Sequence, residues 1–86
     1  GPEWQDASGT LAMNELTLPS WWAGRRVADV EDRAPMRVVY LTRRGRIVLA
    51  RSDELLEEGD VLHVVSHGRD LAGLPGRLHD DETGRG

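Results

Sequence analysis

The chain lacks cysteine entirely among its 86 residues. A disulfide framework, a thiolate nucleophile and a cysteine metal site are therefore excluded. Its apolar runs fall far short of the roughly 20 residues that a membrane-spanning helix needs, and no signal peptide is visible. The sequence also contains no GxGxxG motif, so these residues are not expected to bind a dinucleotide or ATP. We therefore expect a cytoplasmic domain that needs no cofactor.

Lysine is also absent, and all 11 basic residues are arginine. Two explanations stay open. The first is the codon usage of a GC-rich genome; the second is selection for arginine forks, which bind phosphate groups with two parallel hydrogen bonds. The net charge of -4 argues against general nucleic-acid binding, which favours a basic surface.

The length allows one domain, and so small a chain buries too little surface to be more than marginally stable without a partner. Gly1-Pro2 resembles the remnant of a removed purification tag, and residues 1–10 are interpreted as that remnant and a linker. Residues 11–74 form the predicted domain. Residues 75–86 are interpreted as a polar tail, with His79–Gly86 frayed. We expect an internal fragment of a longer protein.

The hydrophobic pattern predicts a β-α-β-β-α-β order. A strand is expected near Ala12–Leu18 and a short helix over Ala23–Arg33, which Pro35 ends. Two apolar runs around the turn Arg43–Arg46 predict a β-hairpin. The stretch Ser52–Gly59 predicts one or two helical turns, with a cap at its start and a glycine at its end.

A strand is then predicted over Val61–His67, followed by a single helical turn over Arg69–Gly73. Helices that interleave with a hairpin predict a small mixed sheet and the α+β class. Both alternating sets of strand residues are apolar: Val38, Tyr40, Ile47, Leu49, Leu62 and Val64 on one, and Val39, Leu41, Val48, Val61 and Val65 on the other. A sheet that is apolar on both faces needs two covers. We therefore predict a homodimer.

Catalytic and metal-binding residues are not evident. No serine lies in a triad-like context, so the chain is not expected to be an enzyme. His63 lies mid-strand and is interpreted as a packed core or interface residue, and the other histidines are too isolated for a zinc site. We therefore predict no metal. A basic cluster around the hairpin is interpreted as a solvated turn or, alternatively, a docking surface for an acidic partner; its members are Arg43, Arg44, Arg46 and Arg51.

Three segments together resemble the TrkA C-terminal domain, the C-lobe of RCK (regulator of potassium conductance) modules. They are "GRRVADVEDR" at Gly24–Arg33, "VVYLTRRGRIVLA" at Val38–Ala50, and "LLEEGDVLHVV" at Leu55–Val65. The resemblance implies a cytoplasmic, dimeric, regulatory domain beside a membrane cation transporter. It also implies a nucleotide-binding lobe N-terminal to this domain. Gly59-Asp60 are interpreted as a structural turn.

The resemblance further implies a cyclic di-AMP site in the groove between two subunits. Val27 and Ala28 would contact the adenines, while Glu31 and Arg33 match the carboxylate-x-arginine step that reaches base and phosphate. The implied site residues are Val27, Ala28, Glu31, Asp32, Arg33, Ala34, Arg37 and Val38.

Three alternatives stay open. The first is that Val27 and Val30 are core residues and Arg33 is a helix-end charge favoured by the helix dipole. The second is a dimerisation module that binds no small ligand. The third keeps the ligand but replaces the potassium uptake system with a cation/proton antiporter.

Overall fold

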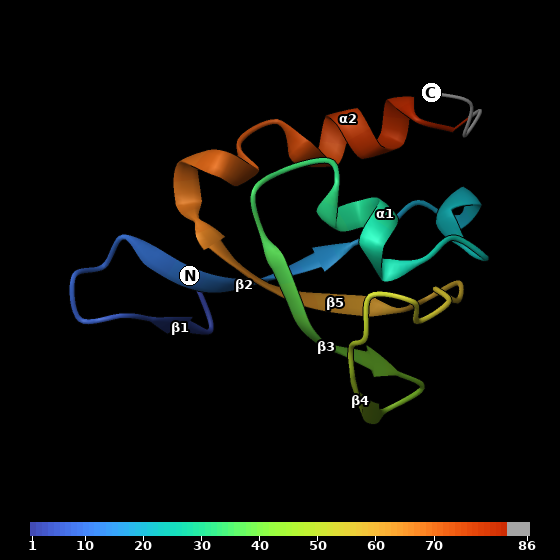
Figure 1. The fold of residues 1–86 in the computed structure, drawn as a ribbon, viewed down its shortest axis with the longest axis horizontal. Coiled ribbons are helices and arrows are strands. Elements are labelled where there is room, and N and C mark those ends of the chain that lie inside the picture. Colours follow the sequence, from blue (N-terminus) through green and yellow to red (C-terminus); the bar gives the residue numbers. More distant parts are fainter. Residues whose placement is uncertain (83–86) are drawn as a thin grey trace.

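The computed structural model describes residues 1–82 and consists of a five-stranded sheet with short helices. Its elements are β1 (Trp4–Gln5), β2 (Leu11–Thr17), the 3-10 turn η1 (Ser20–Trp22), α1 (Val27–Glu31), β3 (Arg37–Arg43), β4 (Arg46–Leu49), β5 (Val61–His67), the 3-10 turn η2 (Gly68–Leu71) and α2 (Leu74–Asp80). The strand order is β1-β2-β5-β3-β4. Both α-helices lie on the same side of the sheet (Figure 1). The α+β class is thus confirmed.

Three predicted elements are confirmed within a residue or two: the strand near 12–18, the hairpin and the strand at 61–67. The predicted helix over 23–33 is shorter, because η1 and an extended stretch precede α1. Every strand pair within residues 1–82 is antiparallel, where the sequence predicted a mixed sheet. No helix among these residues has the length and apolar character needed to cross a bilayer.

The predicted helix over Ser52–Gly59 is wrong, since this segment folds as turns. Its backbone carbonyls are used elsewhere: Ser52 O and Glu54 O accept the first free N–H groups of α1, from Ala28 and Val27. Those N–H groups have no partner within their own helix. Leu56, which is buried, also exchanges backbone bonds of 2.7–2.8 Å with the stretch before α1. The segment therefore caps α1 rather than forming a second helix.

Both ends of the chain contribute more than the sequence predicted. Residues 4–5 of the supposed linker pair with β2 as strand β1. Part of the supposed tail forms α2, with Pro75 in its first turn and Leu74 and Leu78 fully buried four residues apart. Residues 83–86 lie outside the described residues. The ordered domain is therefore wider than the predicted range of 11–74.

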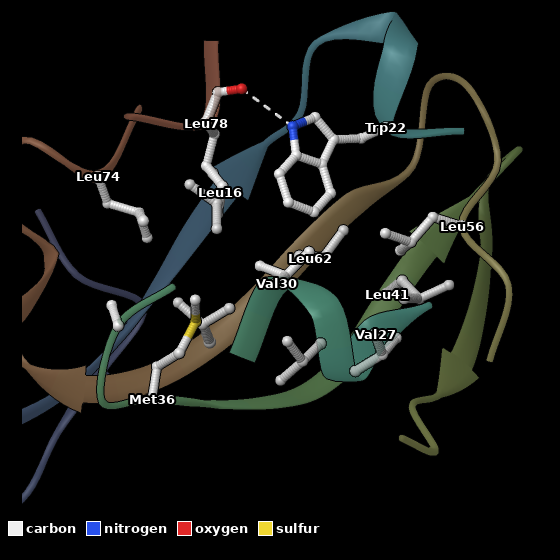
Figure 2. Packing of buried hydrophobic residues seen from close by; sticks show 13 residues of the cluster. Leu16, Trp22, Val27, Val30, Met36, Leu41, Leu56, Leu62, Leu74 and Leu78 are labelled. Carbon is white, nitrogen blue, oxygen red and sulfur yellow. Dashed lines mark hydrogen bonds between the residues drawn. The ribbon is translucent and has the colours of Figure 1, made fainter. Parts of the chain in front are cut away.

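The hydrophobic core lies between the sheet and the helices (Figure 2). Trp22 is fully buried there and its indole Nε1–H donates to the carbonyl of Leu78 at 3.0 Å. Leu62 from the central strand and Val30 from α1 complete the contact around the ring (Figure 2). One tryptophan thus joins α1, α2 and the sheet.

Asp60, which directly precedes β5, forms a buried ion pair with Arg43 at the end of β3. The guanidinium of Arg43 donates to both carboxylate oxygens of Asp60 at 2.8–2.9 Å, and the backbone N–H of Glu57 adds a third bond. Burial alone would raise the pKa of Asp60, but these donors hold it below its usual value. Arg43 also contacts Glu54, so it fixes the 52–60 segment to β3.

We expect Asp60→Asn to lower the free energy of unfolding by about 3 kcal/mol near neutral pH, because it removes the buried carboxylate that accepts two hydrogen bonds from the Arg43 guanidinium. Because the folded-state pKa of Asp60 is depressed, its contribution is complete above the ordinary aspartate value of about 3.9 and disappears as the pH falls through the folded-state pKa. Urea denaturation at neutral and acidic pH measures both effects. The exposed Glu58→Gln variant is the control, and a loss that does not shrink on acidification would contradict this assignment.

Candidate functional site

One face of the sheet carries no covering element within residues 1–82. The strand register places Trp4, Met13, Tyr40, Ile47, Leu49 and Val65 on this face, together with His63. Three of these side chains are strongly exposed: Trp4 at 47%, Ile47 at 69% and Leu49 at 77%. We call this surface the open face. Large apolar side chains exposed on an uncovered sheet face point to an interaction site.

A shallow hollow of about 440 Å³ lies where the open face meets the α1–β3 loop. Its size is within the usual range for small-molecule sites. Its lining residues are Leu11, Glu31, Ala34, Pro35, Met36, Arg37, Val65, Ser66 and His67. The hollow therefore joins the start of β2, the end of β5 and the entrance to β3, which are adjacent because β5 lies between the other two strands.

Glu31 fixes the shape of this hollow. Its Oε2 accepts the backbone N–H of Val38 at 2.9 Å, which ties the end of α1 to the start of β3. Its Oε1 lies 3.9 Å from the guanidinium of Arg37. The side chain of Arg37 is 82% exposed, so the guanidinium is free to reach an anionic ligand. One rim of the hollow thus has the hydrogen-bonded carboxylate of Glu31 and the exposed guanidinium of Arg37.

Three of the eight predicted site residues, Glu31, Ala34 and Arg37, line the hollow. Val27 and Val38 are buried in the core instead, as the core alternative expected for Val27. Of the other predicted site residues, Ala28 is half-buried on α1, Asp32 is exposed at the end of that helix, and Arg33 points to α2.

Arg33 is held by an acid on the far side of α1. Its guanidinium contacts the Asp81 carboxylate at 2.7–2.8 Å and lies 5.4 Å from the centre of the Trp22 ring. Arg25 approaches the same carboxylate and stacks on the same ring at 4.0 Å. The hydrogen bond from Arg33 lowers the pKa of Asp81. Glu31 and Arg33 therefore face different neighbours although they are two residues apart.

Six lining residues were not predicted as site residues: Leu11, Pro35, Met36, Val65, Ser66 and His67. Ser66 is buried, and its hydroxyl has no hydrogen-bond partner among residues 1–82. His67 and the neighbouring Arg69 border a second hollow beside the first. The available signal was the pair Ser66 and His67 at the end of the strand predicted over Val61–His67, because serine and histidine are unusual in an apolar strand.

The sequence of the chain matches a known domain family over residues 13–74, that of the TrkA-C domain. It is also similar to the Trk system potassium uptake protein TrkA of Streptomyces coelicolor, with 33% identity over 64 residues. That alignment covers 74% of this chain and 29% of the Streptomyces protein. The chain therefore spans less than a third of the length of that relative.

Solved structures share the fold at low sequence identity. The RCK C domain of the potassium transport protein KtrA, in complex with cyclic di-AMP, has a TM-score of 0.67 and 20% identity, covering 77% of this chain and 81% of that one. The RCK_C dimer of BusR from S. agalactiae, also with cyclic di-AMP, has a TM-score of 0.63 and 19% identity, covering 81% and 95%. The GsuK RCK domain has a TM-score of 0.71 and 20% identity, covering 87% and 17%.

We expect Glu31→Ala to lower the free energy of unfolding by about 1–3 kcal/mol, because the N–H of Val38 loses its acceptor in a part-buried position. Glu31→Gln keeps a carbonyl oxygen there and is expected to retain most of the stability. Urea denaturation of the two variants, with the exposed Glu58→Ala as the control, measures the difference. Equal losses in the Ala and Gln variants would contradict the assigned role of Glu31.

Proposed function

The chain belongs to the TrkA-C domain family, and from this premise we propose that it is the regulatory, ligand-sensing domain of a Trk-type potassium uptake protein. The ligand we propose is cyclic di-AMP, bound between two subunits. The observation that supports this most directly is the hollow at the edge of the open face, where Glu31, Ala34 and Arg37 lie together. Two structural relatives were solved with the same ligand.

The chemistry of the hollow suits half of such a ligand. Pro35, Met36 and Val65 offer apolar contacts for an adenine ring. The exposed guanidinium of Arg37 can donate charge-assisted hydrogen bonds to a phosphate. His67 also lines the hollow and supplies a further polar group. A two-fold ligand needs the same patch from each of two copies.

The open face supplies the means to bring two copies together. Its exposed apolar side chains continue into the hollow, since Leu11, Val65 and His67 belong to the same side of the strands as His63. A second subunit on this face would close the hollow from above and remove Ile47 and Leu49 from water. We propose this face as the homodimer interface.

Regulation would then follow from dimer geometry. A ligand that binds one arrangement of the two subunits more tightly shifts the population towards it, by no more than its difference in affinity. In the full-length protein, a nucleotide-binding lobe N-terminal to this domain would transmit the change, on the cytoplasmic side, to a membrane potassium transporter. We propose no catalytic role.

The ligand-free alternative has a specific observation in its favour. Val27 and Val38 are buried in the core, and Arg33 is engaged with Asp81. Fewer of the implied contacts are thus free than the resemblance suggested. A dimerisation module without a small ligand would keep the open face and leave the hollow unused. A regulatory subunit of a cation/proton antiporter would use the same interface with another transporter.

We expect calorimetry to detect cyclic di-AMP binding at micromolar concentration, with one ligand per dimer. Arg37→Ala should weaken binding by about tenfold or more, because a charge-assisted phosphate contact is lost. Arg33→Ala should weaken it less, since Arg33 is held by Asp81. The exposed hairpin variant Arg46→Ala, which loses the same charge, should bind as the unmodified chain does. Absence of heat and of thermal stabilisation would favour the ligand-free module.

The dimer is tested separately by sedimentation. We expect the unmodified chain to form dimers and Leu49→Glu to shift them to monomers, because the substitution places a charge on the apolar open face. Leu55→Glu is the matched control: Leu55 is 50% exposed but lies in the segment that caps α1. Both variants dimerising equally well would place the interface elsewhere.

A further inference from the structure

Three potential metal ligands meet at the centre of the open face, away from the hollow. They are Glu3, which precedes β1, Glu15 on β2 and His63 on β5. Their ligating atoms all lie within 4.8 Å of one another. Glu15 and His63 are direct cross-strand partners, so the sheet register fixes their proximity.

The imidazole of His63 is held in the orientation that a metal ligand requires. Its Nε2 is 2.8 Å from the Thr42 hydroxyl, and its Nδ1 points to the Glu3 carboxylate at 2.8–3.0 Å. His63 is 4% exposed, and its ring stacks on that of Tyr40 with 3.9 Å between the ring centres. A hydrogen bond on the far nitrogen is the usual device that orients a metal-bound histidine and fixes its tautomer.

The two carboxylates have no arginine partner among residues 1–82, and the Glu3 carboxylate contacts the His63 imidazole at 2.8 Å. The other clustered acids of the fold are neutralised by arginine, as Asp60 is by Arg43 and Asp81 by Arg33. By contrast, within residues 1–82 no arginine lies within 4.0 Å of Glu3 or Glu15. Two carboxylates beside a buried imidazole on an apolar face therefore form a local excess of negative charge, which a cation would offset.

We propose that Glu3, Glu15 and His63 form a binding site for a divalent transition-metal cation such as Zn²⁺. One imidazole nitrogen with two carboxylate oxygens is a donor set that suits zinc, whereas Mg²⁺ and Ca²⁺ prefer oxygen alone. Donors on one zinc ion lie about 3–3.5 Å apart, given bonds of about 2.0–2.2 Å. Glu3 and His63 Nδ1 are 2.8–3.0 Å apart, slightly closer than this, so the ion would replace the hydrogen bond between them. The exposed side chain of Glu15 can rotate to complete the set.

All three ligands come from one copy of the chain, so the site is complete in a monomer. Sequence reasoning missed it for a definite reason. Glu3 was assigned to a linker, and His63 was considered without the strands that flank it. The site therefore depends on β1, whose pairing with β2 positions Glu3 above the centre of the sheet.

Calorimetry with Zn²⁺ and the unmodified chain tests the proposal. Loss of an outer-shell partner typically weakens metal binding by about 10- to 100-fold. Thr42→Val removes the hydrogen bond that orients His63, so it should weaken zinc binding by about that factor. Glu15→Gln removes a direct ligand and should weaken zinc binding by more than about tenfold. Glu58→Gln and His79→Gln should bind zinc unchanged. Circular dichroism confirms that each variant is folded.

Nuclear magnetic resonance then locates the ion. Zinc should shift the imidazole signals of His63 before those of His67 and His79, and Mg²⁺ at the same concentration should shift none of them. Zinc binding that is unchanged in Glu15→Gln, shifts confined to His67 or His79, or no zinc binding by the unmodified chain would each overturn the proposal. No proposed zinc ligand lines the hollow, so these measurements, made without cyclic di-AMP, can fail while cyclic di-AMP still binds.

Discussion

The structure depends on one constraint: a five-stranded sheet with apolar side chains on both faces has helices over only one of them. On the covered face, Trp22 joins α1 and α2 to the central strand, and the core is complete within one copy of the chain. On the other face, Ile47 and Leu49 remain in water. A domain of this size gains too little from a single core to leave such a surface without use. The features that suggest function all lie on or beside this open face.

The α1–β3 loop connects the two faces. Glu31 is at the end of the helix that packs into the core, yet its carboxylate fixes Val38 and lies at the rim of the hollow. A change at the rim is therefore transmitted to the packing of α1 through one side chain. The same arrangement explains why Arg33 does not share the rim. Two residues after Glu31, Arg33 is directed towards α2, where Asp81 holds it.

The sequence predicted the elements whose determinants are local. The turn at Arg43–Arg46 and the strand at 61–67 carry their signals within a few residues, and both are confirmed. The segment 52–59 was predicted as a helix because its caps and acids are typical of one. Its carbonyls bind α1 and its end is held by Arg43, contacts that no local pattern reveals. Helix α2 was missed because its proline and glycine suggested a break, although the burial of Leu74 and Leu78 outweighs them.

The candidate site shows the same division. The resemblance selected the loop that borders the hollow, but a motif along the chain cannot show that residues two apart face different neighbours, or that His67 and Arg37 line the same hollow. The antiparallel register supplies that information, and it also brings Glu3 to His63.

Coupling between the two proposed sites follows from this geometry. If cyclic di-AMP and a cation each favour the dimer that covers the open face, the dimer must raise the affinity for both by the same factor, because linkage between binding equilibria is reciprocal. The open face, rather than either pocket alone, is then the element through which the domain integrates its signals.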